Sequence, residues 1–111
     1  MFVASWQDYL IALFSALFLV NGVPHFLHGV SGKQFPTPFS GGAGTLDGPV
    51  RNVFWGAANL AVGGALSWAI ARSLADPSIV NELGLVGTLG GAFLAYAFGN
   101  PERIRGRNKA G

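Results

Sequence analysis

The sequence predicts an all-α membrane protein with three transmembrane helices, folded as a single polytopic domain over residues 1–111. Two observations carry this prediction. Only 11% of the residues are charged, against about 25% in an average soluble domain. The charges are also segregated, so that three apolar stretches lie between them, and each approaches the roughly 20 residues that a helix needs to cross a bilayer.

The expected spans cover residues 9–29, 53–71 and 83–99, of which the third is the shortest. The alternative is a soluble helical bundle, but a soluble helix needs a polar face, and AANLAVGGALSWAIA offers almost none. A cleaved signal peptide begins with positive charge, whereas no Lys or Arg precedes Lys33. We therefore expect the first span to be retained.

The positions of Lys and Arg predict the orientation, because basic residues near the ends of spans stay in the cytoplasm. With the C-terminus inside, the outer face receives only Arg72, and the cytoplasmic face receives Lys33, Arg51, Arg103, Arg105, Arg107 and Lys109. The last four form a basic tail in residues 101–111, which we interpret as a membrane-surface anchor. This explains the pI near 9.5 without a nucleic-acid partner.

Residues 31–50 form a long cytoplasmic loop rich in Gly and Pro, a composition typical of functional or disordered loops. Its FPTPF segment cannot be helical, because each proline lacks an amide donor. Phe35 and Phe39 therefore either lie in the membrane interface or fold back over the helix ends. The second connection is a tight turn at Asp76 and Pro77, with Ser78 as the expected N-cap of the third span.

Small residues repeat every four positions in the second and third spans, a pattern that lets membrane helices pack closely. The expected packing residues are Ala57, Ala61, Ala65 and Ala69 in the second span, and Gly87, Gly91, Ala95 and Gly99 in the third. The short turn between these spans indicates a tightly packed hairpin. The first span is bulkier and would present its surface to lipid or to a partner.

Pro24 predicts a kink in the first span, because it removes a helical hydrogen bond and clashes with the carbonyl of residue 20. Asn21, His25 and His28 lie at i, i+4 and i+7 and share one helix face. Counting residues from the cytoplasmic ends brings Asn21 level with Asn59, His25 with Trp55, and His28 with Asn52. We therefore expect a polar cluster in the cytoplasmic half of the bundle: Asn21, His25, His28, Asn52, Trp55, Asn59, Tyr96 and Asn100.

This cluster has two main interpretations. It either joins the helices by hydrogen bonds, or it forms a pH-sensitive site on a proton or solute pathway, since histidine titrates near neutral pH. A coupled transporter usually needs a charge within a span, and the expected spans contain none. We predict no cofactor, although metal or haem ligation by His25 and His28 is an open alternative. No cysteine is present to supply a thiolate, and no serine has a base at its depth, so we predict no enzyme.

The phrase NGVPHFLHGVSGKQFPTPF, followed by GPVRNVFWGAANLAVGG, resembles an uncharacterised family of small bacterial inner-membrane proteins that share an NGxPHFxxGxSGxxFxTPF segment. The resemblance covers about residues 21–64 and implies the membrane class and the bacterial inner membrane, without an activity. The first span is also similar to the G-x-x-HF pattern of DoxX-like proteins, which usually have four spans rather than three.

A chain this small cannot enclose a conventional transport pathway alone. We therefore expect a non-enzymatic accessory or structural subunit of a larger membrane complex. Its partners would be the lipid bilayer and other membrane subunits or itself, with the bulky face of the first span as the contact surface. The alternative is an oligomeric small channel or transporter that uses His25 and His28.

Overall fold

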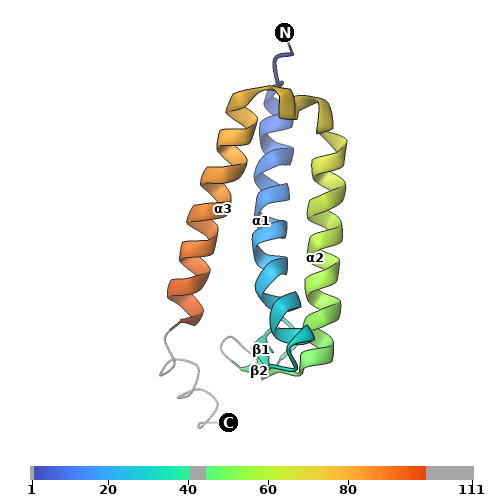
Figure 1. Cartoon of the computed structure of the whole chain (residues 1–111), viewed down its shortest axis with the longest axis vertical. Coiled ribbons are helices and arrows are strands. Elements are labelled where there is room, and N and C mark those ends of the chain that lie inside the picture. The colour runs from blue at the N-terminus through green and yellow to red at the C-terminus, as the bar shows by residue number, and fades with distance from the viewer. Residues whose placement is uncertain (1, 41–44, 100–111) are drawn as a thin grey trace.

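The computed structural model describes residues 2–40 and 45–99 and is dominated by three long helices (Figure 1). These are α1 (Trp6–Val30), α2 (Pro49–Ala69) and α3 (Pro77–Phe98). The loop between α1 and α2 carries a short antiparallel pair of strands, β1 (Phe35–Pro36) and β2 (Leu46–Asp47), and a 3-10 helix, η1 (Ala71–Ala75), joins α2 to α3. The expected basic anchor lies outside the described residues: Arg103, Arg105, Arg107 and Lys109.

Two of the three helices, α1 and α3, are long and apolar enough to cross a membrane. The third, α2, has 21 residues, which is sufficient length, but its hydropathy falls short by the same measure. Its sequence explains why, since it contains Arg51, Asn52 and Asn59 among many small residues. The described residues therefore contain two candidate membrane spans, α1 and α3, and α2 does not meet the same hydropathy criterion.

The ends of the helices follow from capping residues. Ser5 and Asp8 form a capping box at the start of α1, in which each side chain accepts the other residue's backbone N–H. At the start of α3, Asp76 is the N-cap and Pro77 occupies the first turn. The expectation that Ser78 caps α3 is therefore wrong, because Asp76 accepts a hydrogen bond from the Ser78 backbone N–H. As a result, α3 starts six residues before the expected span and includes Glu82.

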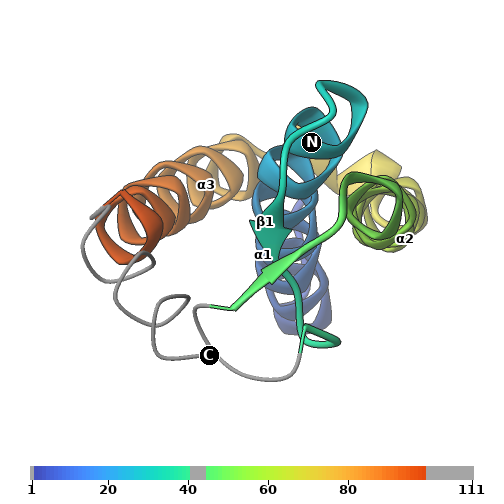
Figure 2. The same ribbon diagram turned by 90° about the horizontal axis from the view of Figure 1, so that it is seen from below.

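Helix α1 is the central element, with α2 on one side and α3 on the other (Figures 1 and 2). The predicted tight hairpin of the second and third spans is therefore wrong, because α2 and α3 have no extensive interface with each other. The expected α2 packing row is exposed: Ala57, Ala61, Ala65 and Ala69. The expected α3 row follows the side nearest α1, with Gly87 and Gly91 half-buried and Ala95 and Gly99 exposed.

A different set of small residues brings α2 against α1. Gly56 and Gly63 are buried on α2, and Gly22 and Gly29 are buried on α1. A Cβ atom built on Gly29 would lie 2.6 Å from the Pro49 carbonyl oxygen, so only glycine permits this approach. The close contact of two backbones is the usual way in which small residues join membrane helices, and here it involves α1.

Pro24 lies inside α1 without ending it, because the helix continues from Trp6 to Val30. The final turns of α1, drawn in cyan, lean toward α2 in Figure 1. At the opposite end of the molecule, Ala12 of α1 packs against Ile70 and Ile79 in a small apolar core. The loop strands and η1 therefore lie at opposite ends of the helices (Figure 1).

Candidate functional site

Polar side chains of α1 and α2 meet at three levels and form what we call the polar interface. Its members are Ser15, Asn21 and His25 of α1, with Asn52, Asn59 and Ser67 of α2. Each member is buried or half-buried. A buried polar group is costly unless it is hydrogen-bonded, so the pairing at each level decides what this interface can do.

The level nearest η1 is a pair of serines. Ser15 Oγ donates to the Gly63 carbonyl at 2.8 Å and lies 2.5 Å from Ser67 Oγ. Because Ser15 uses its only proton on the carbonyl, Ser67 is the donor between the two hydroxyls. Each bond at this level therefore links α1 to α2.

The middle level is a pair of asparagines. Asn21 Nδ2 donates to Asn59 Oδ1 at 3.2 Å, and Asn59 Nδ2 donates to the Trp55 carbonyl at 2.8 Å. The sequence places Asn21 and Asn59 at equal depth, and the structure joins them by this hydrogen bond. The second bond fixes the Asn59 amide, which leaves its oxygen directed at α1.

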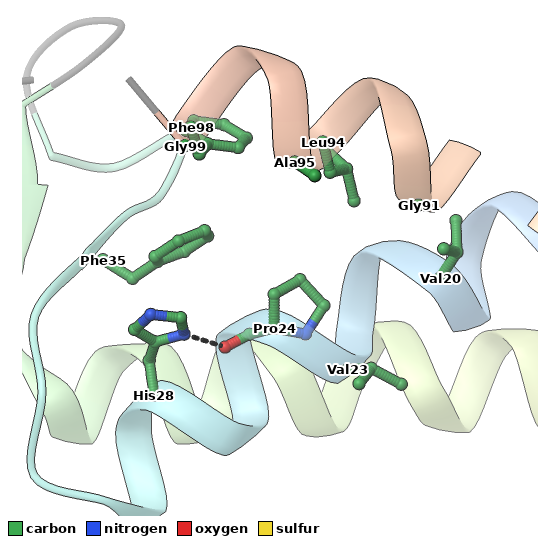
Figure 3. Close-up of a pocket in the computed structure, with 10 residues that line it drawn as sticks. All are labelled: Val20, Val23, Pro24, His28, Phe35, Gly91, Leu94, Ala95, Phe98 and Gly99. Carbon is green, nitrogen blue, oxygen red and sulfur yellow. Dashed lines mark hydrogen bonds between the residues drawn. The ribbon is translucent and has the colours of Figure 1, made fainter. Parts of the chain in front are cut away.

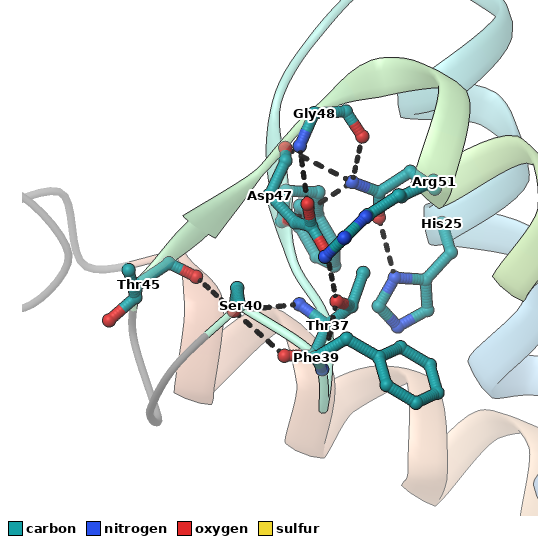
Figure 4. A network of polar contacts seen from close by, with 10 residues as sticks. His25, Thr37, Phe39, Ser40, Thr45, Asp47, Gly48 and Arg51 are labelled. Atoms are coloured by element: carbon teal, nitrogen blue, oxygen red, sulfur yellow. Dashed lines mark hydrogen bonds and ion pairs between the residues drawn. The ribbon is translucent and has the colours of Figure 1, made fainter.

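The third level connects His25, labelled in Figure 4, to the loop through Asn52. His25 Nδ1 lies 2.9 Å from Asn52 Oδ1, and both side chains are buried. The Asn52 amide donates at 2.9 Å to the carbonyls of Phe35 and Gly48, and it lies 3.3 Å from that of Asp47. With its nitrogen occupied as a donor, Asn52 accepts through Oδ1, so His25 carries its proton on Nδ1.

The loop itself is held by Asp47. This carboxylate accepts from the Thr37 hydroxyl at 2.5 Å and from the Gly48 N–H at 2.8 Å, and it faces Arg51 at 3.8 Å (Figure 4). The Thr37 hydrogen bond is the main cause that holds the pKa of Asp47 below its ordinary value, assisted by Gly48 and Arg51. Ser40 closes the turn, because its hydroxyl lies within hydrogen-bonding distance of the carbonyls of Thr37 at 2.8 Å and Thr45 at 2.7 Å.

Phe35 folds back over the helix ends, one of the two placements that the sequence allows. Its buried ring lies edge-on to His25 at 5.0 Å, over His28 at 4.2 Å, and 5.1 Å from Phe98 of α3. Phe39 differs, because it is 61% exposed and contacts only the edge of the Trp55 ring among the ring pairs described. The first half of FPTPF is thus part of the interior.

His28 lies one turn beyond His25 and belongs to a different environment (Figure 3). Its Nδ1 donates to the Pro24 carbonyl at 2.7 Å, so in the neutral ring Nε2 is the remaining acceptor. The ring borders a cavity of about 420 Å³ between α1 and α3. The two histidines therefore donate from Nδ1 to different acceptors, His25 to Asn52 and His28 to the Pro24 carbonyl.

Six members of the expected polar cluster gather at this end of the molecule: Asn21, His25, His28, Asn52, Trp55 and Asn59. Asn52 pairs with His25, one turn away from the expected His28. The indole N–H of Trp55 is buried and has no acceptor within the described part of the chain. Tyr96 is 70% exposed on α3, and Asn100 lies outside the described residues.

Sequence reasoning missed two of these contacts, the Ser15–Ser67 pair and the Thr37–Asp47 pair. Counted from the η1 ends of the expected spans, Ser15 lies six residues in and Ser67 four, so a depth count would have brought the two serines within one helical turn of each other. The Thr37–Asp47 pair carried no such signal, because it depends on how the loop strands align.

Within residues 2–40 and 45–99, no group of three or more His, Cys, Asp or Glu is arranged to hold a metal ion. Both histidines use Nδ1 as a hydrogen-bond donor, so only their Nε2 atoms are available to a ligand. Comparison with known proteins adds no further guide: no family model, curated protein or solved structure matches this chain.

Proposed function

We propose that this protein is a non-enzymatic structural or accessory subunit of a larger assembly in the bacterial inner membrane. The observation that carries the proposal is the mutual bonding of the polar interface. Ser15, Asn21 and His25 each bond to a group on α2. Side chains that satisfy one another in this way stabilise helix association and are not directed at a transported solute.

The surface proposed for the partner is the outward face of α2. This face presents the row Ala57, Ala61, Ala65 and Ala69, all of which are exposed. Gly64 lies on the same face, and a Cβ atom there would meet nothing within 4 Å. Small residues at a spacing of four allow a second helix to approach closely.

The composition of α2 supports a protein contact over a lipid contact. Of the three long helices, α2 is the one whose hydropathy is too low for a candidate span, yet its Phe54 and Trp68 side chains are 71% and 83% exposed. A partner helix would cover both the large aromatic groups and the small-residue row. The bulky residues of α1, the contact surface expected from the sequence, also remain exposed, among them Leu10, Phe14 and Leu17, although α1 is flanked by α2 and α3 (Figure 2). We place the contact on α2 because its face combines the small-residue row with the two exposed aromatic side chains.

In the proposed topology all three helices cross the membrane, with the N-terminus outside and the C-terminus in the cytoplasm. Lys33 and Arg51 lie at the loop end of the helices, and Arg72 lies in η1 at the other end. The excess of basic residues at the loop end supports a cytoplasmic position for it. Cysteines introduced singly at Ser40 and at Ser5 test this, because an impermeant thiol reagent added to intact cells should label only the outer one.

Purification from the native membrane in mild detergent, followed by mass spectrometry, tests the function. The proposal expects either stoichiometric companion polypeptides or a defined oligomer. A monomer without companions would overturn it. An oligomer that also conducts protons or solute in sealed vesicles would favour the channel alternative, with His25 and His28 at its site.

The double variant Ala61→Leu, Ala65→Leu tests the surface, since two leucines would block close approach to α2. We expect loss of the companions or of the oligomer while the isolated subunit keeps its thermal stability. Ala92→Leu is the matched control, because Ala92 is an exposed alanine on α3. Retention of the assembly in the double variant would exclude the α2 face as the contact.

A further inference from the structure

Helices α1 and α3 lie close together near η1 and separate toward the loop end (Figures 1 and 2). The space between their separated ends contains the cavity of about 420 Å³, which we call the α1–α3 pocket (Figure 3). Its volume falls within the roughly 300–1,000 Å³ of small-molecule sites. Phe35 of the loop and Phe98 of α3 close its end, with their ring centres 5.1 Å apart.

The walls of the pocket are apolar, and the small residues of α3 leave the space between the two helices unfilled. On α3, Gly91, Ala95 and Gly99 face the pocket, and on α1 the walls include Val20 and Pro24. Both bordering helices are apolar enough to cross a membrane, so a ligand would enter from the hydrocarbon phase. Only 6% of the apolar window of α3 is buried within the chain, which leaves this helix free to border a lipid-soluble molecule.

Among the described residues that line the pocket, only His28 has a polar side chain, its imidazole. Donation from Nδ1 to the Pro24 carbonyl at 2.7 Å fixes the neutral tautomer and makes Nε2 the acceptor, and within residues 2–40 and 45–99 no hydrogen bond to Nε2 is formed. Phe35 lies over the same ring at 4.2 Å and an interplanar angle of 32°. The hydrogen bond to Pro24 and the contact with Phe35 thus fix the orientation of the imidazole, as a ligand-binding group requires.

We propose that the α1–α3 pocket binds a membrane-soluble phenol, a molecule with an aromatic ring, one hydroxyl and an alkyl tail. The hydroxyl donates to His28 Nε2, the ring packs against Phe35 and Phe98, and the tail follows the small-residue wall past Gly91. A ligand carbonyl would not suit the neutral imidazole, because neither group could donate. This inference does not depend on the proposed function, which concerns the outward face of α2.

The test uses the whole protein in lipid nanodiscs and two probes, 4-octylphenol and 4-octylanisole. The probes differ only in that a methyl group replaces the hydroxyl proton of the phenol. Binding is followed by NMR, from the Gly91 and Gly99 amides and the His28 ring nitrogens. We expect the phenol to bind about 5-fold more tightly, the contribution of one hydrogen bond.

Equal affinity of the two probes would overturn the proposal and would identify the pocket as a site for an acyl chain. Ala95→Leu should abolish binding of both probes by filling the wall, whereas Ala92→Leu, an exposed α3 position outside the pocket, should not. Equal effects of these two substitutions would place binding elsewhere. His28→Phe keeps the ring and should remove only the preference for the phenol; a preserved preference would contradict the role of His28.

If His28→Phe fails to fold, the comparison of the two probes on the native protein and the Ala95→Leu variant still decide the outcome.

Discussion

Asn52 connects His25 to the chain that follows α1, since its side chain accepts from His25 Nδ1 at 2.9 Å and donates to the carbonyls of Phe35 and Gly48. One fully buried amide thus joins a helix, a strand and the start of a second helix. The loop is held in place from inside the bundle, and its geometry depends on a residue outside the loop.

Replacement of Asn52 by Ala should therefore destabilise the protein strongly. It would leave the His25 N–H and the Phe35 carbonyl without the Asn52 side chain, whereas the Gly48 carbonyl still accepts from the Asn52 backbone N–H. Unpaired buried groups cost about 1–3 kcal/mol each. We expect a loss of about 2–4 kcal/mol, measured by unfolding in mixed micelles. Asn81→Ala is the control, because Asn81 is exposed on α3. Equal stability of the two variants would show that the Asn52 contacts contribute little.

The two glycines Gly56 and Gly64 of α2 give a matched pair of substitutions. A Cβ atom on Gly56 would meet the Phe26 backbone, whereas one on Gly64 would meet nothing within 4 Å. Gly56→Ala should separate α1 from α2 at a cost of about 1–3 kcal/mol. Gly64→Ala should be neutral or slightly stabilising, since alanine favours helix. The same unfolding measurement compares them, and a larger loss for Gly64→Ala would contradict the assigned helix face.

Asp47 should make the loop sensitive to acid. Its pKa in the folded protein is lowered from about 3.8, chiefly by the Thr37 hydroxyl. A lowered pKa contributes stability above the unfolded value, and this contribution is lost as the pH falls through the folded value. Limited proteolysis of the loop should therefore be constant from pH 7 to about pH 4 and should rise below it.

Asp47→Asn is the control for this pH dependence, because other carboxylates titrate over the same range. The variant should be cleaved faster at neutral pH, and the difference from the native protein should vanish in acid. Thr37→Val should reduce the same difference by removing the main cause of the shift. A difference that does not narrow as the pH falls below the ordinary value of about 3.8 would contradict the assignment to Asp47.

Asp76 should anchor the N-terminal segment as well as start α3. It accepts from the Ala4 N–H at 3.0 Å and from the Ser78 N–H at 2.9 Å, and the Ala4 bond is the main cause that lowers its pKa. Asp76→Ala should accelerate hydrogen exchange at both amides. Ser78→Ala should leave the Ala4 amide protected, so equal exchange of Ala4 in the two variants would exclude Asp76 as its partner.

The helical class and two of the candidate spans could be predicted from the sequence, because hydropathy and charge spacing are local properties. The depth count also placed Asn21 beside Asn59, since a constant rise of 1.5 Å per residue fixes relative height along parallel axes. The count also brought His25 level with Trp55, and their ring centres lie 6.5 Å apart, but His25 donates to Asn52, which the count had placed beside His28. The start of α3 was expected too late, because Asp76 and Pro77 start this helix earlier than its apolar run does.

The neighbours of each helix could not be predicted in the same way. The spacing of Ala57 and Ala61 identifies a face that permits close contact, but it does not name the partner, and here that face is exposed. The signal for the actual contact lay in α1, where Gly22 and Gly29 are buried against α2. Their smallness was hidden among the bulky residues of the same helix.

The central position of α1 has a consequence for how changes combine. Because α2 and α3 each pack on α1 and share no extensive interface, substitutions on their separate contacts do not meet across an α2–α3 interface. The effects of such substitutions on the free energy of unfolding should add, as they do at independent sites. Changes in α1 should instead couple to both flanking helices, so tolerance to substitution is expected to differ most sharply between the first helix and the other two.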